Sequence, residues 1–280
     1  MTKNNWSPVE KRFFQRQDIQ KQTTKIPYIL VDNFPDLGFL TSLRFLEWVS
    51  ENQEGVISLP TGKTPEYFIK WTHHLLNNWD APDLKKLRKE NGLDLVKKPD
   101  LSRLKFVQID EFYPIDSSQH NSFYNYGQHY YIDGFEMDRS KGLFIDCNKL
   151  PTAKEKPITE IFPDSIVDLS LRLRSPSSKL EEDQQATILL VDQWCSEYEN
   201  KITDKGGIGL FLGGIGPDGH IAFNVRGSDH NSTTRLIETN FETQAAAATD
   251  LGGIEVSRNR LVITIGLATI TANPDATAII

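Results

Sequence analysis

The stretch "VISLPTGKTPEYF", residues 56–68, carries the strongest fold signal in the chain. A short apolar run ends at a Gly-Lys-Thr turn, and a segment that reads as a helix starts near Pro65. A Walker A nucleotide loop needs a glycine five residues before Gly62, but that position holds Ile57. The stretch therefore predicts a strand, a turn and a helix, and argues against a nucleotide-binding loop.

The turn itself, Thr61, Gly62, Lys63 and Thr64, has two interpretations. Backbone N–H groups at the start of a helix attract anions, so these four residues are candidates for binding a phosphate group. The alternative is an ordinary strand-to-helix turn, in which Thr64 caps the helix and Gly62 relieves backbone strain. The local sequence leaves both interpretations open.

Outward from this stretch, strands and helices alternate along the chain. Expected strands are residues 28–31, 104–109, 142–145, 207–212, a segment near Arg235, 261–266 and the final "TAII", and expected helices include 38–52, 65–78, 121–132 and about 181–202. This order predicts an α/β fold with a doubly wound, mostly parallel, Rossmann-like sheet and helices on both faces. Ligands bind such sheets at the carboxyl ends of the strands.

The sequence predicts a single domain at residues 26–280, preceded by an N-terminal extension, residues 1–25. Two charged, proline-containing segments, 77–102 and 151–183, are typical of surface insertions. In the helix near 181–202, residues spaced by three and four form one apolar stripe that we expect in the core: Ile188, Val191, Cys195, Tyr198 and Ile202.

The composition restricts the partners. A net charge of −7 and a pI near 5.4 argue against nucleic acid and against an anionic membrane, and no apolar run reaches the roughly 20 residues that cross a bilayer. A small-molecule partner is expected. Cys147 and Cys195 have neither zinc-site nor CxxC spacing, so they are predicted to be buried thiols in a protein of the reducing cytoplasm. A homo-oligomer stays open.

Two further segments carry polar residues after apolar runs. "FVQIDEFYP" places Asp110 and Glu111 behind one expected strand, and "LFLGGIGPDGHIAFN" places Asp218 and His220 behind another. A carboxylate next to an imidazole can fix its tautomer and make it a proton shuttle. The alternative for His220 is a hydrogen-bonded loop histidine without a chemical role.

The second segment also matches a dinucleotide motif. Gly214, Gly216 and Gly219 have the GxGxxG spacing, and Glu238 lies about 20 residues further on. A dinucleotide fold requires a helix to run on from the third glycine, yet the following residues, 220–233, lack a helical period and contain Gly227. The pattern therefore favours a tight turn that projects Asp218 and His220 into one crevice.

Together, "LPTGKTP", "IDEF" and "LFLGGIGPDGHIAFN" resemble the signature loops of glucosamine-6-phosphate deaminases, also called isomerases, which share a superfamily with 6-phosphogluconolactonases. The resemblance covers roughly residues 26–280. It implies that His220, held by Asp218, opens the sugar ring, and that Asp110 moves the proton next to the carbonyl. The implied products are fructose 6-phosphate and ammonia, and the implied chemistry needs no metal or redox cofactor.

The resemblance also implies a phosphate site. Thr61, Gly62, Lys63 and Thr64 would bind the sugar phosphate, and Gly214, Gly216, Arg226 and Arg235 are further candidates for binding the substrate or its phosphate. Lys63 stands where the family usually has a small residue, and Arg226 follows a lost glutamate, so either could supply positive charge to a ligand.

Three positions depart from the family pattern. The pattern reads "HIAFNEPG" where this chain has "HIAFNVRG", so Val225 replaces a glutamate of the ring-opening relay. Thr249 replaces an expected phosphate-binding arginine, and Phe112 replaces the usual tyrosine. The chain also stops before the family's glycine-rich C-terminal loop. Deamination, lactone hydrolysis as in 6-phosphogluconolactonases, and sugar-phosphate binding without catalysis are therefore kept as alternatives.

Overall fold

The computed structural model describes residues 6–16 and 24–280, which form two compact units. The helical unit comprises the described parts of 1–54 with 62–103 and 130–137, and the sheet unit comprises 55–61, 104–129 and 138–280. The predicted extension falls partly outside the described residues, at 1–5 and 17–23.

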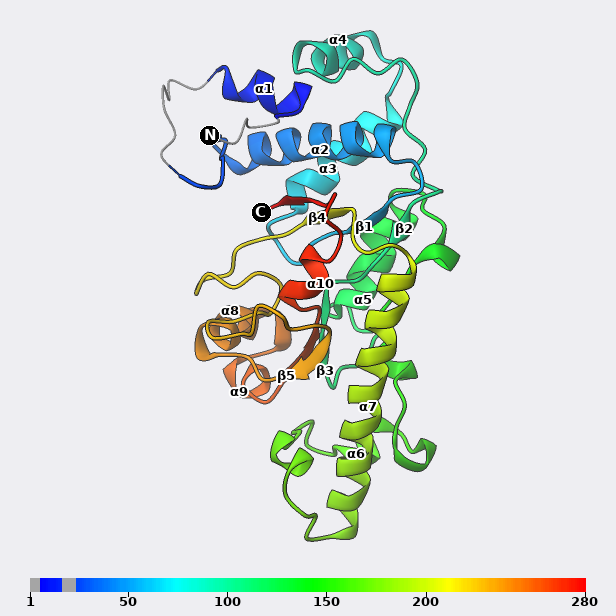
Figure 1. Cartoon of the computed structure of the whole chain (residues 1–280), viewed down its shortest axis with the longest axis vertical. Coiled ribbons are helices and arrows are strands. Elements are labelled where there is room, and N and C mark those ends of the chain that lie inside the picture. The colour runs from blue at the N-terminus through cyan, green and yellow to red at the C-terminus, as the bar shows by residue number, and fades with distance from the viewer. Residues whose placement is uncertain (1–5, 17–23) are drawn as a thin grey trace. The chain divides into compact units, whose positions relative to one another are not determined.

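The helical unit is built from four helices: α1 (Pro8–Phe14), α2 (Phe34–Glu51), α3 (Glu66–Asn77) and α4 (Pro82–Glu90) (Figure 1). Helices α2 and α3 pack closely because Gly38 has no side chain; a Cβ there would lie 2.4 Å from the backbone of Tyr67. The buried Ser42 hydroxyl bonds to Phe68 O across the same interface, at 2.9 Å.

Helix α1 packs on α2 of its own chain. Val9 is fully buried, and the ring of Phe13 lies 6.1 Å from the ring of Phe39 in α2. Val9 N donates to the buried carboxylate of Glu47 at 3.1 Å. The described part of the N-terminal extension is therefore integrated into the helical unit.

The sheet unit contains two sheets. Four short strands form a parallel sheet in the order β2-β1-β4-β7: β1 (Val56–Ser58), β2 (Lys105–Phe106), β4 (Leu210–Leu212) and β7 (Thr277–Ile279). Three more form an antiparallel sheet in the order β3-β6-β5: β3 (Asp110–Tyr113), β5 (Arg235–Ile237) and β6 (Leu261–Thr264). The predicted α/β class with a parallel sheet is confirmed, and the antiparallel sheet is an addition to it.

One long helix, α7, and several shorter helical segments connect these strands. The α-helices are α5 (Phe123–Tyr126), α6 (Ile158–Ile161), α7 (Lys179–Asp204), α8 (Phe241–Leu251), α9 (Ile254–Ser257) and α10 (Leu267–Thr271). One π-helix is η1 (Gly127–Asp133), and the 3-10 turns are η2 (Arg139–Lys141), η3 (Cys147–Lys149), η4 (Ala153–Glu155) and η5 (Leu169–Arg172). Ser178 caps the long helix α7 by accepting from Glu181 N at 3.2 Å.

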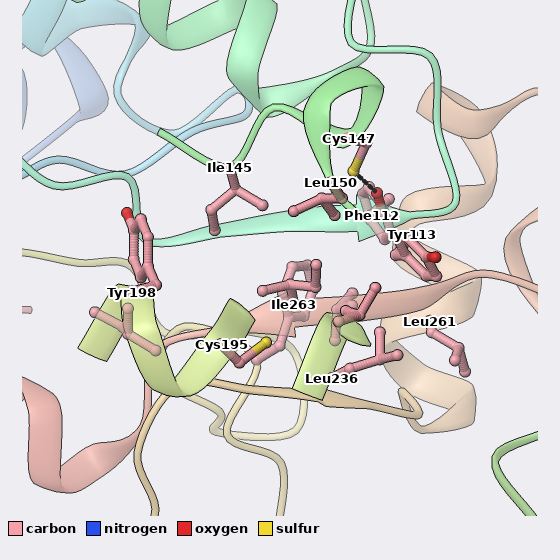
Figure 2. Close-up of a cluster of buried hydrophobic side chains, with 14 of the residues drawn as sticks. Phe112, Tyr113, Ile145, Cys147, Leu150, Cys195, Tyr198, Leu236, Leu261 and Ile263 are labelled. Carbon is pink, nitrogen blue, oxygen red and sulfur yellow. Dashed lines mark hydrogen bonds between the residues drawn. The ribbon is translucent and has the colours of Figure 1, made fainter. Parts of the chain in front are cut away.

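The core of the sheet unit lies between the antiparallel sheet and α7. Figure 2 shows Cys195 and Tyr198 of α7 facing Ile263 of β6, with Cys147 and Ile145 on the other side of β3. Both cysteines are free and buried, as predicted. The predicted stripe of α7 is confirmed, since its five members are 0 to 2% exposed.

Four predictions of local structure are wrong. Residues 28–31 form no strand; they follow Pro27, and Leu30 is 61% exposed, so this apolar run contributes nothing to a sheet core. The expected strand 104–109 is reduced to β2, and only an isolated bridge at Leu143 remains of 142–145. Segment 151–183 is more than surface insertion, because it places Ile161, Phe162 and Leu171 in the core.

Candidate active site

The sequence predicted that Asp110 lies in a loop after a strand. In the structure it lies in a strand. It is the first residue of β3 and pairs with Thr264 of β6, which pairs in turn with Arg235 of β5. Residues directly opposite each other in antiparallel strands share a face, so these three side chains form one row. With strands about 4.8 Å apart, the row spans about 10 Å.

The carboxyl group of Asp110 is held away from water. The residue is 7% exposed, and burial raises its pKa to about 8, with a further contribution from the neighbouring Glu111. No hydrogen bond to this carboxylate is formed by any residue in 6–16 or 24–280. A buried carboxyl group with a pKa near neutrality is suited to accept a proton from a substrate and return it.

Glu111 follows Asp110 in β3, and its carboxylate makes structural contacts. Its carboxylate accepts from Ser122 Oγ at 2.7 Å and from the backbone N–H groups of Phe112, Phe123 and Tyr124 at 2.7 to 3.0 Å. Burial nevertheless raises its pKa to about 7. These contacts tie β3 to the start of α5 and fix the strand that carries Asp110.

The glycine-rich loop after β4 brings Asp218 and His220 together. His220 Nδ1 hydrogen-bonds to Asp218 Oδ1, and both side chains are largely buried. The loop closes on itself, since Gly216 N donates to His220 O at 2.9 Å and Gly219 adopts a φ of +85°. As predicted, no helix follows Gly219: residues 220–234 form turns and bridges.

Gly216 provides the space that the imidazole occupies. A Cβ at this position would lie 2.0 Å from Cε1 and 2.2 Å from Nε2 of His220. At Gly214, by contrast, a Cβ would meet nothing within 4 Å. The two candidate glycines therefore differ: Gly216 packs against the ring, and Gly214 is an open loop position.

Hydrogen bonds attach this loop to the face of the sheet that carries Asp110. Phe223 N donates to Thr264 Oγ1 at 3.1 Å, and Asn224 Nδ2 donates to Ile265 O at 2.9 Å. The ring of Phe223 lies 5.4 Å from that of Phe112, two residues after Asp110, and 5.7 Å from the imidazole of His220. The structure thus brings the Asp218–His220 pair to the same side of the antiparallel sheet as Asp110.

Electrostatics favour an ionised Asp218. Burial opposes ionisation, but hydrogen bonds from Asn240 and His220 outweigh it, so the pKa of Asp218 lies below its ordinary value. Asn240 Nδ2 donates to Asp218 Oδ2 at 2.5 Å, and Thr243 Oγ1 lies 3.3 Å from His220 Nδ1. The sequence analysis missed Asn240 and Thr243, although an asparagine directly before a helical segment is an N-cap signal.

The two candidate arginines line a separate open depression. Arg226 is exposed, and half-buried Arg235 donates to Asn224 Oδ1 at 2.9 Å and to Thr233 O at 3.2 Å. Burial lowers the pKa of Arg235 from its usual high value, with the charge of Asp229 opposing. Neither guanidinium forms an ion pair within the described part of the chain. Ser228, Asp229, Ser232 and Glu238 also line the depression.

The candidate phosphate turn is divided between the units. Thr61 ends the segment 55–61 of the sheet unit, whereas Gly62, Lys63 and Thr64 belong to the helical unit. Gly62 has a φ of +90°, which only glycine adopts without strain, and α3 begins at Glu66 with Pro65 at the N-cap. Thr64 is not the capping residue.

Neither metal ligation nor membrane insertion has support in the described residues. They contain no group of three or more histidine, cysteine, aspartate or glutamate side chains that could hold a metal ion. Among the described helices, none combines the length and the apolar character required to cross a bilayer.

The curated proteins similar to this chain are named glucosamine-6-phosphate isomerases or deaminases. A glucosamine-6-phosphate isomerase of Candida albicans is 43% identical over 90 residues, which are 32% of this chain and 36% of that protein. A glucosamine-6-phosphate deaminase of Caenorhabditis elegans is 49% identical over 76 residues, which are 27% of this chain and 28% of that protein. Over these matched segments, the chain is similar to glucosamine-6-phosphate deaminases and isomerases.

The deaminase resemblance extends to the fold. A solved structure of a monomeric glucosamine-6-phosphate deaminase superimposes with a TM-score of 0.58 at 19% identity, over 86% of this chain and 76% of that one. No family model matches the chain. The matches to the two curated relatives span only about a third of those proteins' length.

Proposed function

We propose that the protein is an amino-sugar phosphate deaminase and isomerase, which converts glucosamine 6-phosphate or a closely related hexosamine phosphate to a ketose phosphate and ammonia. The observation that carries the proposal is the attachment of the Asp218–His220 loop to the face of the antiparallel sheet that holds Asp110. Two proton-transfer groups on one face fit a reaction that first opens a ring and then moves a proton between neighbouring carbons.

In this proposal His220 acts first. Its Nδ1 is held by Asp218, so Nε2 is free to move a proton between the ring oxygen and the C1 hydroxyl of the cyclic sugar. The C1–O ring bond breaks and an open-chain aldehyde forms. No covalent bond to the protein is required.

Asp110 acts second. Its carboxylate takes the proton from C2 while the substrate's ammonium group gives a proton to the C1 oxygen, so that an enolamine with a C1 hydroxyl forms. The carboxyl group then returns its proton to C1, which leaves an iminium ion at C2. Water adds to this iminium ion and ammonia departs as ammonium, which gives the 2-ketose phosphate.

Arg226 and Arg235, which line one depression of the sheet unit, are the residues proposed to bind the phosphate. The other candidates stay predictions from the sequence: Thr61, Gly62, Lys63, Thr64 and Gly214. Support for the arginines is that neither forms an ion pair with any carboxylate in the described ranges. Guanidinium groups favour phosphate because their planar donors match two of its oxygens. Gly216 contributes by admitting the imidazole.

The decisive assay offers glucosamine 6-phosphate and measures ammonia and ketose phosphate together. We expect both products in equal amounts, and Asp110→Asn and His220→Gln each to lower kcat by at least about 100-fold, in the usual range for general acid-base groups. Because Asp110 must be ionised to act as a base, kcat/KM should rise with pH up to about 8.

Two results would redirect the proposal. Val225 is apolar, a substitution that lactone hydrolysis tolerates, so acid release from 6-phosphogluconolactone without ammonia release would assign the protein to the lactonase activity. Saturable binding of glucosamine 6-phosphate without either product would assign it to sugar-phosphate binding alone. The cytoplasmic location and the oligomeric state stay predictions.

A further inference from the structure

The side chain of Asn240 contacts two groups at once. It is the N-cap of α8, where its Oδ1 accepts from Thr243 N at 3.0 Å, while its Nδ2 donates to Asp218 Oδ2 at 2.5 Å. A backbone N–H can only donate, so the amide oxygen must face Thr243 and the amide nitrogen must face Asp218. The orientation of this amide is therefore fixed by the helix that it caps.

That orientation determines how Asp218 meets the imidazole. One carboxylate oxygen of Asp218 is engaged by Asn240, which leaves the other for His220 Nδ1. An ionised carboxylate only accepts, so in the neutral imidazole Nδ1 carries the hydrogen and Nε2 keeps its lone pair. Thr243 Oγ1, 3.3 Å from Nδ1, adds a second polar contact from the same helical turn.

The side-chain contacts that hold Asp218 and His220 come from the start of helix α8. Apart from the loop's own backbone, the described residues that bond to Asp218 or His220 through side chains are Asn240 and Thr243. Val225 stands where the deaminase pattern has a glutamate of the ring-opening relay. The side chain of Val225 has no polar atom. The orienting role of that glutamate is therefore left to other residues.

We propose that Asn240 and Thr243, in the first turn of α8, are positioning residues that hold His220 in the tautomer and orientation required for proton transfer. The inference rests on the proposed function, because it assigns the orientation a purpose in ring opening. It goes beyond that function in naming a helix cap as the source of the alignment.

The sharpest test is Asn240→Asp. Aspartate caps a helix as well as asparagine does, so α8 keeps its cap, but the donor that faces Asp218 is replaced by a second carboxylate. We expect kcat for glucosamine 6-phosphate to fall about tenfold or more, the effect of one lost hydrogen bond to a charged group. KM should change little, because Asn240 is not assigned to the substrate.

A spectroscopic measurement tests the inference without substrate. In protein labelled with ¹⁵N-histidine, the chemical shifts of His220, assigned by comparison with His220→Gln, should report a protonated Nδ1 and an unprotonated Nε2. In Asn240→Asp and in Asn240→Ser, which keeps a capping oxygen but lacks the amide donor, they should report a mixture of tautomers. Thr243→Val should give a smaller change in the same direction.

Glu242→Gln is the matched control. It alters a charge in the same first turn of α8, and Glu242 is exposed. This variant should keep both the parent kcat and the parent tautomer. Unchanged ¹⁵N shifts in Asn240→Asp and Asn240→Ser would overturn the inference. Absence of turnover in the parent would overturn the proposed function alone, since the ¹⁵N result stands without it.

Discussion

Gly216 has no room for a side chain, because the imidazole of His220 fills the space beside it. Gly216→Ala should therefore displace the ring and lower kcat by about tenfold or more, as misplacement of a reacting group does. The backbone at this residue lies outside the left-handed region, so the clash alone is tested. Steady-state kinetics and the melting temperature are the measurements.

Gly214→Ala is the control for that prediction. It adds the same methyl group two residues earlier in the loop, where nothing lies within 4 Å, and the backbone of Gly214 is also outside the left-handed region. Its kcat should stay within about twofold of the parent, because the phosphate contact predicted for Gly214 could come only from its backbone N–H, which alanine keeps. Equal losses in both variants would mean that the loop tolerates no added bulk, and the assigned contact with His220 would be wrong.

Asp110 should make the fold less stable as pH rises. Its pKa is raised from 3.8 to about 8 in the folded state, so the unfolded state loses the proton first. The stability that the protonated group provides is complete below about pH 4 and is lost as pH rises through about 8.

Asp110→Asn removes this titration. Urea unfolding should show the variant more stable than the parent at pH 8 by more than about 1.4 kcal/mol, the free energy of one pKa unit. The difference should shrink towards pH 4. A gap that is constant with pH would show that Asp110 ionises as freely in the fold as in the unfolded chain.

At the scale of elements, Thr264 of β6 holds the histidine loop to the sheet. Its buried hydroxyl accepts from Phe223 N. Thr264→Val keeps the shape but leaves that N–H without its acceptor, which costs about 1–3 kcal/mol. Urea unfolding should detect the loss, and amide exchange at Phe223 should accelerate. Thr264→Ser retains the hydroxyl and should keep the slow exchange.

The same scale shows what the sequence could predict. The stripe from Ile188 to Ile202 predicted α7 because a spacing of three and four residues is local information. Strand pairing is not local: nothing in "IDEFY" indicates that Asp110 pairs with Thr264, 154 positions away by their numbers. The antiparallel sheet was therefore missed, although strands near Arg235 and at 261–266 were expected.

At the scale of the whole molecule, a contact within one loop was more predictable than contacts between distant segments. Glycines and polar residues in one loop identified Asp218 and His220 as a pair, which the structure confirms by their hydrogen bond. The roles of Asn240 and Thr243 depend on how α8 meets that loop, which single-sequence patterns do not encode. The division into two units, with its boundary inside the 61–64 turn, was also beyond the alternation pattern.

Helix α1 contributes to the stability of the helical unit. Phe13 is 9% exposed against Phe39, whereas Phe14 is partly exposed and stacks on Trp6 at 5.3 Å. Phe13→Ala should lower the free energy of unfolding by about 3 kcal/mol, the lower end for a buried phenylalanine. Phe14→Ala should cost clearly less. Equal costs in denaturant titrations would contradict the docking of α1 on α2.

The cap of α8 has an evolutionary consequence. Serine, threonine and aspartate also cap helices, so descendants of this gene can exchange position 240 and keep α8. Selection for this helix alone would not preserve the amide, and drift there would remove the alignment proposed for His220 in molecules that look intact. Architecture is thus a poor guide to which of its descendants keep that alignment.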